Sequence, residues 1–426
     1  MDLFPQTFRI RQSFSAPQVA DVAAEVHAQL TRLDLGRRVA PGQTVAVSAG
    51  SRGIAGIAVI LRAAVEHLKG LGARPFVVPA MGSHGGGTAA GQCQMLDALG
   101  VTEAFLGCPI RASMDTVVVG QAAEGFPIHF DRCALEADHV LVCNRVKPHT
   151  RFAGDIESGL LKMLLIGLGK RAGAEVYHRA IQDYSFDQIV RSVAATVIHK
   201  CHILAGLAVV ENAWDQTARI EAVLPEEFEL REKELLRLAR QWMARLPFDR
   251  ADLLLVDRIG KEISGTGMDT NVIGRKQSDH QAGPGESPRI KLIAVRGLTP
   301  ATHGNAVGIG LAEFCKSSLL ADLDVAATRL NALVANHASA AMLPLDYPTD
   351  REMIGAALGT IGLAAFCDAR LLWISNTLDL TEIECSAAYR DEAQSRSDLE
   401  ILSPLRDLPF DAEGNLPEVR DWEPSI

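Results

Sequence analysis

Three histidines and one lysine in the first half of the sequence have surroundings that are unusual for ordinary core or surface side chains. His84 lies among glycines in GSHGGG, and His149 follows a proline in RVKPHTR. Lys162 interrupts the apolar run LLKMLL, and His178 follows it sixteen positions later. Imidazoles transfer protons or bind metals near neutral pH, and a lysine withdrawn from water can act as a nucleophile or covalent anchor. This combination is typical of an active site.

Cations near these residues indicate an anionic ligand. Ser51 and Arg52 lie in a loop of small residues between a strand-like and a helix-like segment, where backbone N–H groups and a guanidinium can bind a phosphate or carboxylate. A second group of cations flanks His149 and favours its neutral, proton-accepting form: Arg145, Lys147 and Arg151. Ordinary turns, and a lysine whose amine reaches water, are the alternative interpretations of these segments.

The elements that would position these side chains follow an α/β pattern. Residues 44–48, 76–79 and 139–143 are apolar and β-rich, and each segment opens into a polar or glycine-rich loop. Helical patterns at 54–71 and 88–99 alternate with them. Ligands of open α/β sheets bind at the carboxyl ends of the strands, so we expect the three loops to meet there.

The pattern predicts two α/β domains with mostly parallel sheets and the active site in the cleft between them. A charged helical segment at 226–246 ends at Pro247, and a new strand-like segment begins directly afterwards. We therefore expect an N-terminal domain over 1–247 and a second α/β domain over 248–395. Residues 396–426 are rich in proline and acidic residues and are predicted to form a C-terminal tail.

Composition excludes several classes of protein. The net charge of −10 argues against nucleic-acid binding. Eight cysteines without a Cys-x-x-Cys pair predict free thiols in a reducing compartment, with neither a disulfide framework nor a thiolate-bound cluster. The N-terminus lacks the features of a signal peptide, and no apolar run is long enough to span a bilayer. We therefore expect a cytoplasmic protein that does not bind membranes.

The stretch from 48 to 180 resembles the nickel-pincer-nucleotide-dependent lactate racemase family. In that family a Thr-Arg pair contacts the cofactor phosphate and the substrate region, and Ser51-Arg52 matches it. A Gly-x-His motif and a His shortly before Ala-Gly supply the two acid/base histidines, which His84 and His149 match. The resemblance continues, more weakly, through the second half of the chain.

The same resemblance assigns roles to the lysine and the third histidine. A family lysine is bonded covalently to the cofactor, and a histidine sixteen positions later binds nickel; Lys162 and His178 have this spacing. The implied cofactor is the nickel-pincer nucleotide, nickel pyridinium-3-thioamide-5-thiocarboxylic acid mononucleotide. Arg52, with Lys147 or Arg151, would hold its phosphate or the substrate carboxylate. Enzymes that synthesise this cofactor would be partners.

The resemblance implies a racemase or epimerase of a small 2-hydroxy acid that works by reversible hydride transfer, with His84 and His149 as acid and base. The sequence departs from lactate racemases at the substrate side. Ala49 replaces an acidic residue, and the longer segment before Lys162 reads Asp155-Ile-Glu157-Ser. In the second domain Asp269-Thr-Asn271 is present, but Ile273-Gly274-Arg275-Lys276 replaces a Tyr-Gln pair and a lysine. A 2-hydroxy acid other than lactate therefore fits better.

Three other functions remain open at this point. An oxidoreductase with a diffusible nicotinamide cofactor would need a Gly-x-Gly-x-x-Gly turn, and residues 82–87 have a different pattern. A metal-dependent hydrolase or lyase could use His84, His149 and His178 as ligands, but it leaves Lys162 without a role. A protein that binds the nickel nucleotide without turnover is the third alternative.

Overall fold

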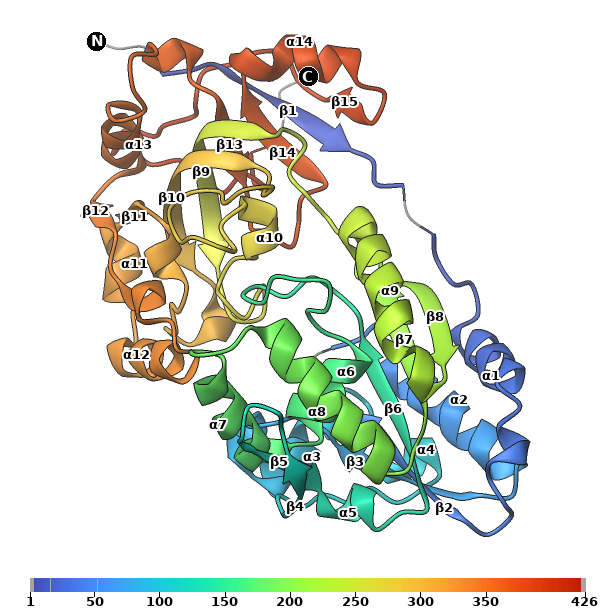
Figure 1. Cartoon of the computed structure of the whole chain (residues 1–426). Helices are drawn as coiled ribbons and strands as arrows, with labels where there is room; N and C mark the ends of the chain where they lie inside the picture. Colours follow the sequence, from blue (N-terminus) through green and yellow to red (C-terminus); the bar gives the residue numbers. More distant parts are fainter. Residues whose placement is uncertain (1–3, 16, 52, 423–426) are drawn as a thin grey trace. The chain divides into compact units, whose positions relative to one another are not determined.

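The computed structural model describes residues 4–15, 17–51 and 53–422. The chain divides into two compact units, one formed by Ala16–Met243 and the other by Met1–Ser15 together with Ala244–Ile426 (Figure 1). Within the described residues, no helix is both long enough and apolar enough to cross a membrane.

The unit Ala16–Met243 is built on a five-stranded sheet with the order β3-β2-β6-β7-β8. Its first four strands in this order are parallel, and β8 pairs antiparallel to β7 at the edge. The strands are β2 (Thr44–Ala49), β3 (Arg74–Pro79), β6 (His139–Arg145), β7 (Ile203–Glu211) and β8 (Thr217–Val223). The strands expected at 44–48, 76–79 and 139–143 are therefore confirmed.

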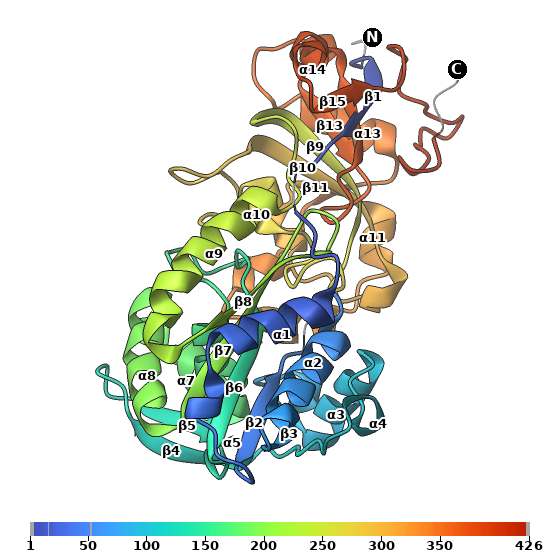
Figure 2. The same ribbon diagram turned by 90° about the vertical axis from the view of Figure 1, so that its right-hand side faces the viewer.

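Helices cover both faces of this sheet because its strands are apolar on both sides. On β2, Val45 and Val47 pack with the core under α1 and α2, whereas Ala46 packs with the core under α8 and α9. Figures 1 and 2 show these two helix pairs on opposite sides of the sheet. The helices of this unit are α1 (Val22–Arg32), α2 (Ile57–Gly70), α3 (Ala89–Ala98), α4 (Glu103–Leu106), α5 (Arg132–Leu135), α6 (Leu160–Lys162), α7 (Lys170–Ala180), α8 (Phe186–Lys200) and α9 (Phe228–Trp242).

A separate hairpin lies outside the five-stranded sheet. It is formed by β4 (Thr116–Gln121) and β5 (Pro127–Asp131), which pair with each other in a two-stranded sheet. β5 leads directly into α5, and the same hairpin contacts α7 and α8.

The second unit contains an eight-stranded sheet with the order β12-β11-β10-β9-β13-β14-β1-β15. The strands from β12 to β13 in this order are parallel, and β14, β1 and β15 pair antiparallel. The strands are β1 (Thr7–Gln12), β9 (Arg250–Ile259), β10 (Arg289–Leu298), β11 (Phe314–Lys316), β12 (Leu345–Tyr347), β13 (Leu371–Ile374), β14 (Glu382–Ser386) and β15 (Leu399–Ile401). The helices are α10 (Thr270–Ile273), α11 (Ser317–Ala321), α12 (Val325–Val334), α13 (Asp350–Leu358) and α14 (Arg390–Ser395).

The predicted domain boundaries differ from the structure near both ends of the chain. β1, expected in the N-terminal domain 1–247, is a strand of the second unit between β14 and β15. Residues expected to form a tail after 395 include β15 and the buried core residues Leu408, Leu416 and Val419. Pairing between segments almost four hundred residues apart leaves no local signal in the sequence, which explains the difference.

Candidate active site

Three loops leave the same edge of the five-stranded sheet. From β2 the chain passes to β3 on one side, and β6 lies on the other side of β2. This reversal of direction is a topological switch point, where ligands of open α/β sheets bind. The loops that follow β2, β3 and β6 contain Ser51, His84 and His149, as the sequence predicted.

The first two loops meet at His84. Its Nδ1 atom lies 2.5 Å from the hydroxyl oxygen of Ser51. His84 precedes a short turn formed by Gly85–Gly87, in which all three glycines have positive φ. A Cβ atom on Gly85 would lie 2.7 Å from the backbone of Gln92, so this turn requires glycine. Arg52, the predicted anion-binding residue, lies outside the described residues.

The side chain of Gln92 on α3 forms hydrogen bonds with the same loop. This buried side chain donates its amide N–H to the carbonyl oxygens of Gly82, at 3.1 Å, and His84, at 3.3 Å. Backbone carbonyl groups in a loop need such partners where water is excluded. The sequence pattern did not identify Gln92, because a glutamine within a helix gives no functional signal.

The His149 side chain is fixed by its own loop. Its Nδ1 accepts hydrogen bonds from the backbone N–H groups of Arg151, at 3.0 Å, and Phe152, at 3.1 Å. A ring nitrogen that accepts hydrogen bonds bears no proton, so the neutral ring carries its proton on Nε2. The sequence predicted a neutral His149 but could not predict which nitrogen is protonated.

Glu157 organises this loop from within. Its buried carboxylate accepts the backbone N–H of His149, at 2.8 Å, and that of Gly154, at 3.3 Å. It also forms an ion pair with Arg240 of α9, at 2.8 Å. Hydrogen bonds to charged acceptors are stronger than neutral ones. The sequence singled out Glu157 only as a departure from lactate racemases, and the structure shows it as the support of His149.

Lys147 lies where the loop closes on itself. Its backbone N–H donates to the hydroxyl oxygen of Ser158, at 2.8 Å, and its carbonyl oxygen accepts from the same hydroxyl, at 2.5 Å. Nearby, the Asn144 side chain donates to the carbonyl oxygen of Gly159, at 2.7 Å. Hydrogen bonds therefore connect the beginning of the loop with its end, just before the segment that contains Lys162.

An aromatic stack connects His149 with Lys162. The Phe152 ring stacks on the imidazole of His149 and on the ring of Phe186, with centroid separations of 4.1 Å and interplanar angles of 9° in both cases. The Nζ atom of Lys162 lies 5.2 Å from the centroid of the Phe152 ring. Two of the predicted site residues thus contact the same aromatic side chain.

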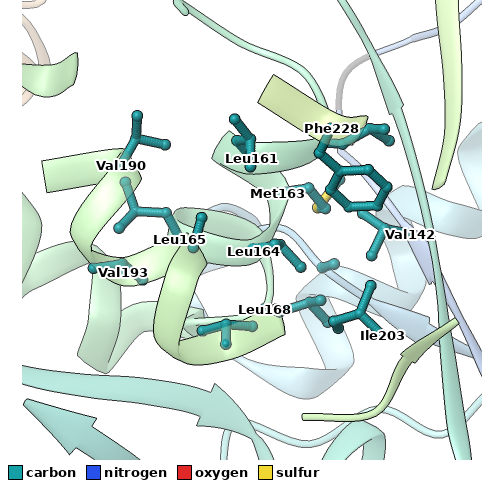
Figure 3. Packing of buried hydrophobic residues seen from close by; sticks show 14 of the residues in the cluster. Val142, Leu161, Met163, Leu164, Leu165, Leu168, Val190, Val193, Ile203 and Phe228 are labelled. Atoms are coloured by element: carbon teal, nitrogen blue, oxygen red, sulfur yellow. The ribbon is translucent and has the colours of Figure 1, made fainter. Parts of the chain in front are cut away.

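Lys162 lies at a break in helical geometry. It ends the three-residue α6, and Met163–Gly167 continue as a π-helix. Leu161, Met163, Leu164 and Leu165 are buried against neighbouring helices and strands (Figure 3), whereas Lys162 is half-buried. π-Helical turns occur frequently at functional sites, and this turn places a lysine beside a tightly packed core.

His178 lies in the last turn of α7 and interacts electrostatically with Lys162. Burial lowers the pKa of the His178 imidazole, and the positive charge of Lys162 lowers it further. Both effects favour the neutral imidazole, which is the form that binds metals. The structure therefore brings together the lysine and the histidine that are sixteen positions apart in the sequence.

The His84 loop packs against the segment between Lys162 and His178. The backbone N–H of Gly82 donates to the carbonyl oxygen of Gly167, at 3.4 Å. A Cβ atom on Gly82 would lie 3.1 Å from the side chain of Ile166 and 3.7 Å from that of Ala174. All the predicted site residues that the structure describes thus belong to one unit.

No group of three or more His, Cys, Asp or Glu side chains within the described residues is placed to hold a metal ion by itself. The alternative in which His84, His149 and His178 form a metal-binding triad therefore finds no support. A cofactor that brings its own donor atoms needs only one protein ligand, so this observation does not bear on a pincer-type cofactor.

The fold and the site define an α/β protein in which His84 and His149 follow parallel strands of one sheet and Lys162 and His178 lie on helices of the same unit. Residues 9–187 match the family described as the lactate racemase N-terminal domain. This match contains every described site residue from Ser51 to His178. The relationship to the lactate racemase family that the sequence indicates is therefore confirmed for this part of the chain.

Solved structures with a similar fold include the lactate racemase apoprotein from Thermoanaerobacterium thermosaccharolyticum. It has a TM-score of 0.52 and 13% sequence identity, over 87% of this chain and 98% of that chain. A structural-genomics protein from Thermotoga maritima has a TM-score of 0.47 and 15% identity, over 67% of this chain and 72% of that chain. A search of curated proteins gave no significant match. The first likeness confirms the predicted α/β fold with mostly parallel sheets.

Proposed function

We propose that this chain is a racemase or epimerase of a small 2-hydroxy acid that uses a nickel-pincer nucleotide attached to Lys162. The observation that supports it most directly is the contact of Phe152 with both His149 and Lys162, with His178 near enough for the charge of Lys162 to lower its pKa. An amine that can anchor a cofactor and a neutral imidazole that can bind its nickel lie within electrostatic reach of each other. His149 and Phe152 lie beside them.

The residues present fit this cofactor. Lys162 would form the covalent attachment, and His178 would supply the protein ligand to nickel, for which imidazole is a suitable donor. When bound, the nickel-pincer nucleotide supplies a reversible acceptor for the hydride on C2 of the substrate. Ser51 and Arg52 would bind its phosphate, and Lys147 is a second cation for the phosphate or the substrate carboxylate.

His84 is suited to exchange a proton with the substrate hydroxyl. Its Nδ1 partner is the hydroxyl of Ser51, which can either donate or accept a hydrogen bond. The Nε2 atom of His84 can therefore take up or release a proton without loss of the Ser51 contact. This property is what a general acid/base requires in both directions of a racemisation.

His149 is the second acid/base group of the proposal, and its loop imposes a condition on that role. In the conformation described here Nε2 bears the proton and can donate a hydrogen bond to a substrate oxygen. To accept a proton at Nε2, the ring must first move its existing proton to Nδ1. That nitrogen must then give up its two backbone hydrogen bonds.

The substrate is proposed to be a 2-hydroxy acid other than lactate, since the second unit has Ile273 to Lys276 where lactate racemases have other side chains. The protein is also proposed to be cytoplasmic, which is supported by its eight free cysteines. That the site lies between the two domains stays a prediction.

The proposal is tested by co-expressing the chain with enzymes that synthesise the cofactor. The loaded protein is incubated with single enantiomers of 2-hydroxy acids, and the products are resolved by chiral chromatography. We expect inversion at C2 for at least one acid. His84→Gln should lower turnover about a hundredfold or more while nickel content stays unchanged, because general acid/base catalysis contributes about 10²–10⁴ in rate. His199→Ala, a change at an exposed histidine on α8, is the control.

Loss of nickel in His84→Gln with retention in His178→Ala would reverse the assigned roles. A fully loaded protein that inverts none of the acids would contradict the racemase proposal and leave the nickel-nucleotide carrier as the better description.

A further inference from the structure

A buried ion pair lies at the turn between the Lys162 segment and the His178 helix. The Nζ atom of Lys170 lies 2.6 Å from Oδ2 of Asp131, and neither side chain has exposed surface. The same ammonium group donates a hydrogen bond to the carbonyl oxygen of Pro79. The other oxygen of Asp131 accepts the backbone N–H of Ala134, at 3.0 Å.

These contacts join three segments of the site. Lys170 is the first residue of α7, and Asp131 is the last residue of β5. Pro79 is the last residue of β3, five positions before His84. One ammonium group therefore connects the base of the His84 loop with the start of the helix that contains His178.

Lys170 also lies midway between the two residues proposed to hold the cofactor. Lys162 precedes it by eight positions, and His178 follows it by eight. The chain changes direction at Gly169, where a Cβ atom would lie 2.3 Å from the carbonyl oxygen of Leu165. Lys170 thus lies at the junction between the π-helical segment and α7.

Lys170 combines two energetically unfavourable features. Lys170 has φ of 55°, a left-handed backbone conformation that a residue with a Cβ rarely adopts. Its charge and that of Asp131 are removed from water, and buried ion pairs often contribute little net stability compared with apolar side chains of similar size. Backbone strain of this kind persists where the surroundings fix the conformation, and it clusters at functional sites.

We propose that Lys170 and Asp131 are positioning residues that set the separation of Lys162 and His178 and the base of the His84 loop. This inference rests on the proposed function for its purpose, but the positioning itself can be measured without the cofactor. It predicts that an apolar replacement of the pair leaves the fold intact and loosens these segments.

The test compares Lys170→Met/Asp131→Leu with the wild-type chain by hydrogen–deuterium exchange and mass spectrometry, without cofactor. We expect amides of residues 80–88 and 163–180 to exchange at least about tenfold faster in the double variant, with strands β2, β6 and β7 unaffected. The temperature of thermal unfolding should be unchanged or raised. Arg62→Gln/Glu66→Gln removes an exposed ion pair of α2 and is the matched control, with no change expected.

Nickel retention gives the second readout. In chains co-expressed with the cofactor-synthesising enzymes, the double variant should retain at least about tenfold less nickel than the wild type after dialysis, because a small misplacement of binding groups is costly. If exchange rates in both segments equal those of the wild type, the proposal is wrong. If they rise but the wild-type chain takes up no nickel, the positioning role stands and the proposed function fails.

A measurement on the wild type covers the case in which the double variant does not fold. Amides of residues 169–174 should then exchange only through global unfolding of their unit. Exchange as fast as that of the partly exposed turn at 123–125 would overturn the inference.

Discussion

His149 is held by hydrogen bonds that originate in its own loop, and this determines the chemistry that its ring can perform. Arg151 and Phe152 donate to Nδ1, and Glu157 accepts the backbone N–H of the same residue. Neighbouring cations in the sequence indicate a neutral ring. Only the closed loop shows that the proton lies on Nε2, because the two donors come from backbone groups and not from side chains.

The tautomer of His149 can be measured directly. In protein labelled with ¹⁵N-histidine, we expect Nε2 of His149 to have the chemical shift of a protonated nitrogen and Nδ1 that of an unprotonated one. His149→Gln assigns the signals by their loss, and exposed His199 serves as a reference ring. A proton found on Nδ1 of neutral His149 would contradict the arrangement described here.

Phe152 gives a second prediction at the scale of residues. Leucine at this position keeps apolar volume but removes both ring stacks, with His149 and with Phe186. We expect Phe152→Leu to lower turnover about ten- to a hundredfold, since small misplacements of catalytic groups have effects of that size. Nickel content should be unchanged. Phe105→Leu, at a partly exposed ring on α4, is the control, and equal turnover in the two variants would show that the stack has no such role.

At the scale of elements, α6 and the π-helix are held in place by α9. Glu232 of α9 is fully buried and accepts the backbone N–H of Leu161, at 3.1 Å. Gly159, which directly precedes α6, has a φ of 101°, and a Cβ atom there would also collide with this carboxyl group, so this position requires a glycine. Burial raises the pKa of Glu232 well above its usual value, despite the opposing effect of the backbone N–H groups.

The raised pKa of Glu232 predicts how stability changes with pH. A folded-state pKa above the unfolded one means that the folded chain binds more protons between the two values, so this residue lowers stability as the pH rises from about 4.5. Glu232→Gln removes the titration. We expect its stability relative to the wild type to increase between pH 5 and pH 8, measured by urea unfolding. Exposed Glu227→Gln should show no such trend, and a pH-independent difference for Glu232→Gln would contradict the buried carboxyl.

Much of the arrangement of elements could be predicted from local patterns. The strands β2, β3 and β6 are apolar runs that end in polar loops, and their order along the chain fixed the place of the site. The π-helix at Met163–Gly167 could not be predicted, since an apolar run of nine residues has the same pattern for any helical geometry. Lys170 and Asp131 were missed for a similar reason. A lysine and an aspartate 39 positions apart give no sign in the sequence that they are buried together.

At the scale of the whole molecule, the first and last strands, β1 and β15, lie next to each other in the same sheet. Phe8 and Ile10 of β1 are fully buried between β14 and β15, and Arg9 forms a buried ion pair with Glu384. The strand β1 therefore helps to stabilise the unit to which β14 and β15 belong. Along the sequence β1 directly precedes α1, but its contacts with the distant strands β14 and β15 determine the unit to which β1 belongs.

This arrangement predicts that a core substitution in β1 destabilises the second unit and spares the first. Ile10→Ala should lower its free energy of unfolding by about 2–5 kcal/mol, the usual effect of truncating a buried isoleucine. Hydrogen exchange should therefore become faster in β9, β13 and β14 but not in β2, β6 or β7. Arg11→Gln, at the exposed neighbouring position, is the control. Faster exchange in β2, β6 and β7 instead would place β1 with the first unit.

The covalent state of Lys162 tests the central claim most directly. The chain is purified after co-expression with cofactor-synthesising enzymes and analysed by intact mass, peptide mapping and nickel content, with Lys162→Arg alongside. We expect an added nucleotide mass on the peptide that contains Lys162 and close to one nickel per chain, and neither of them in the variant. An unmodified Lys162 without nickel, under conditions that load a lactate racemase, would contradict it.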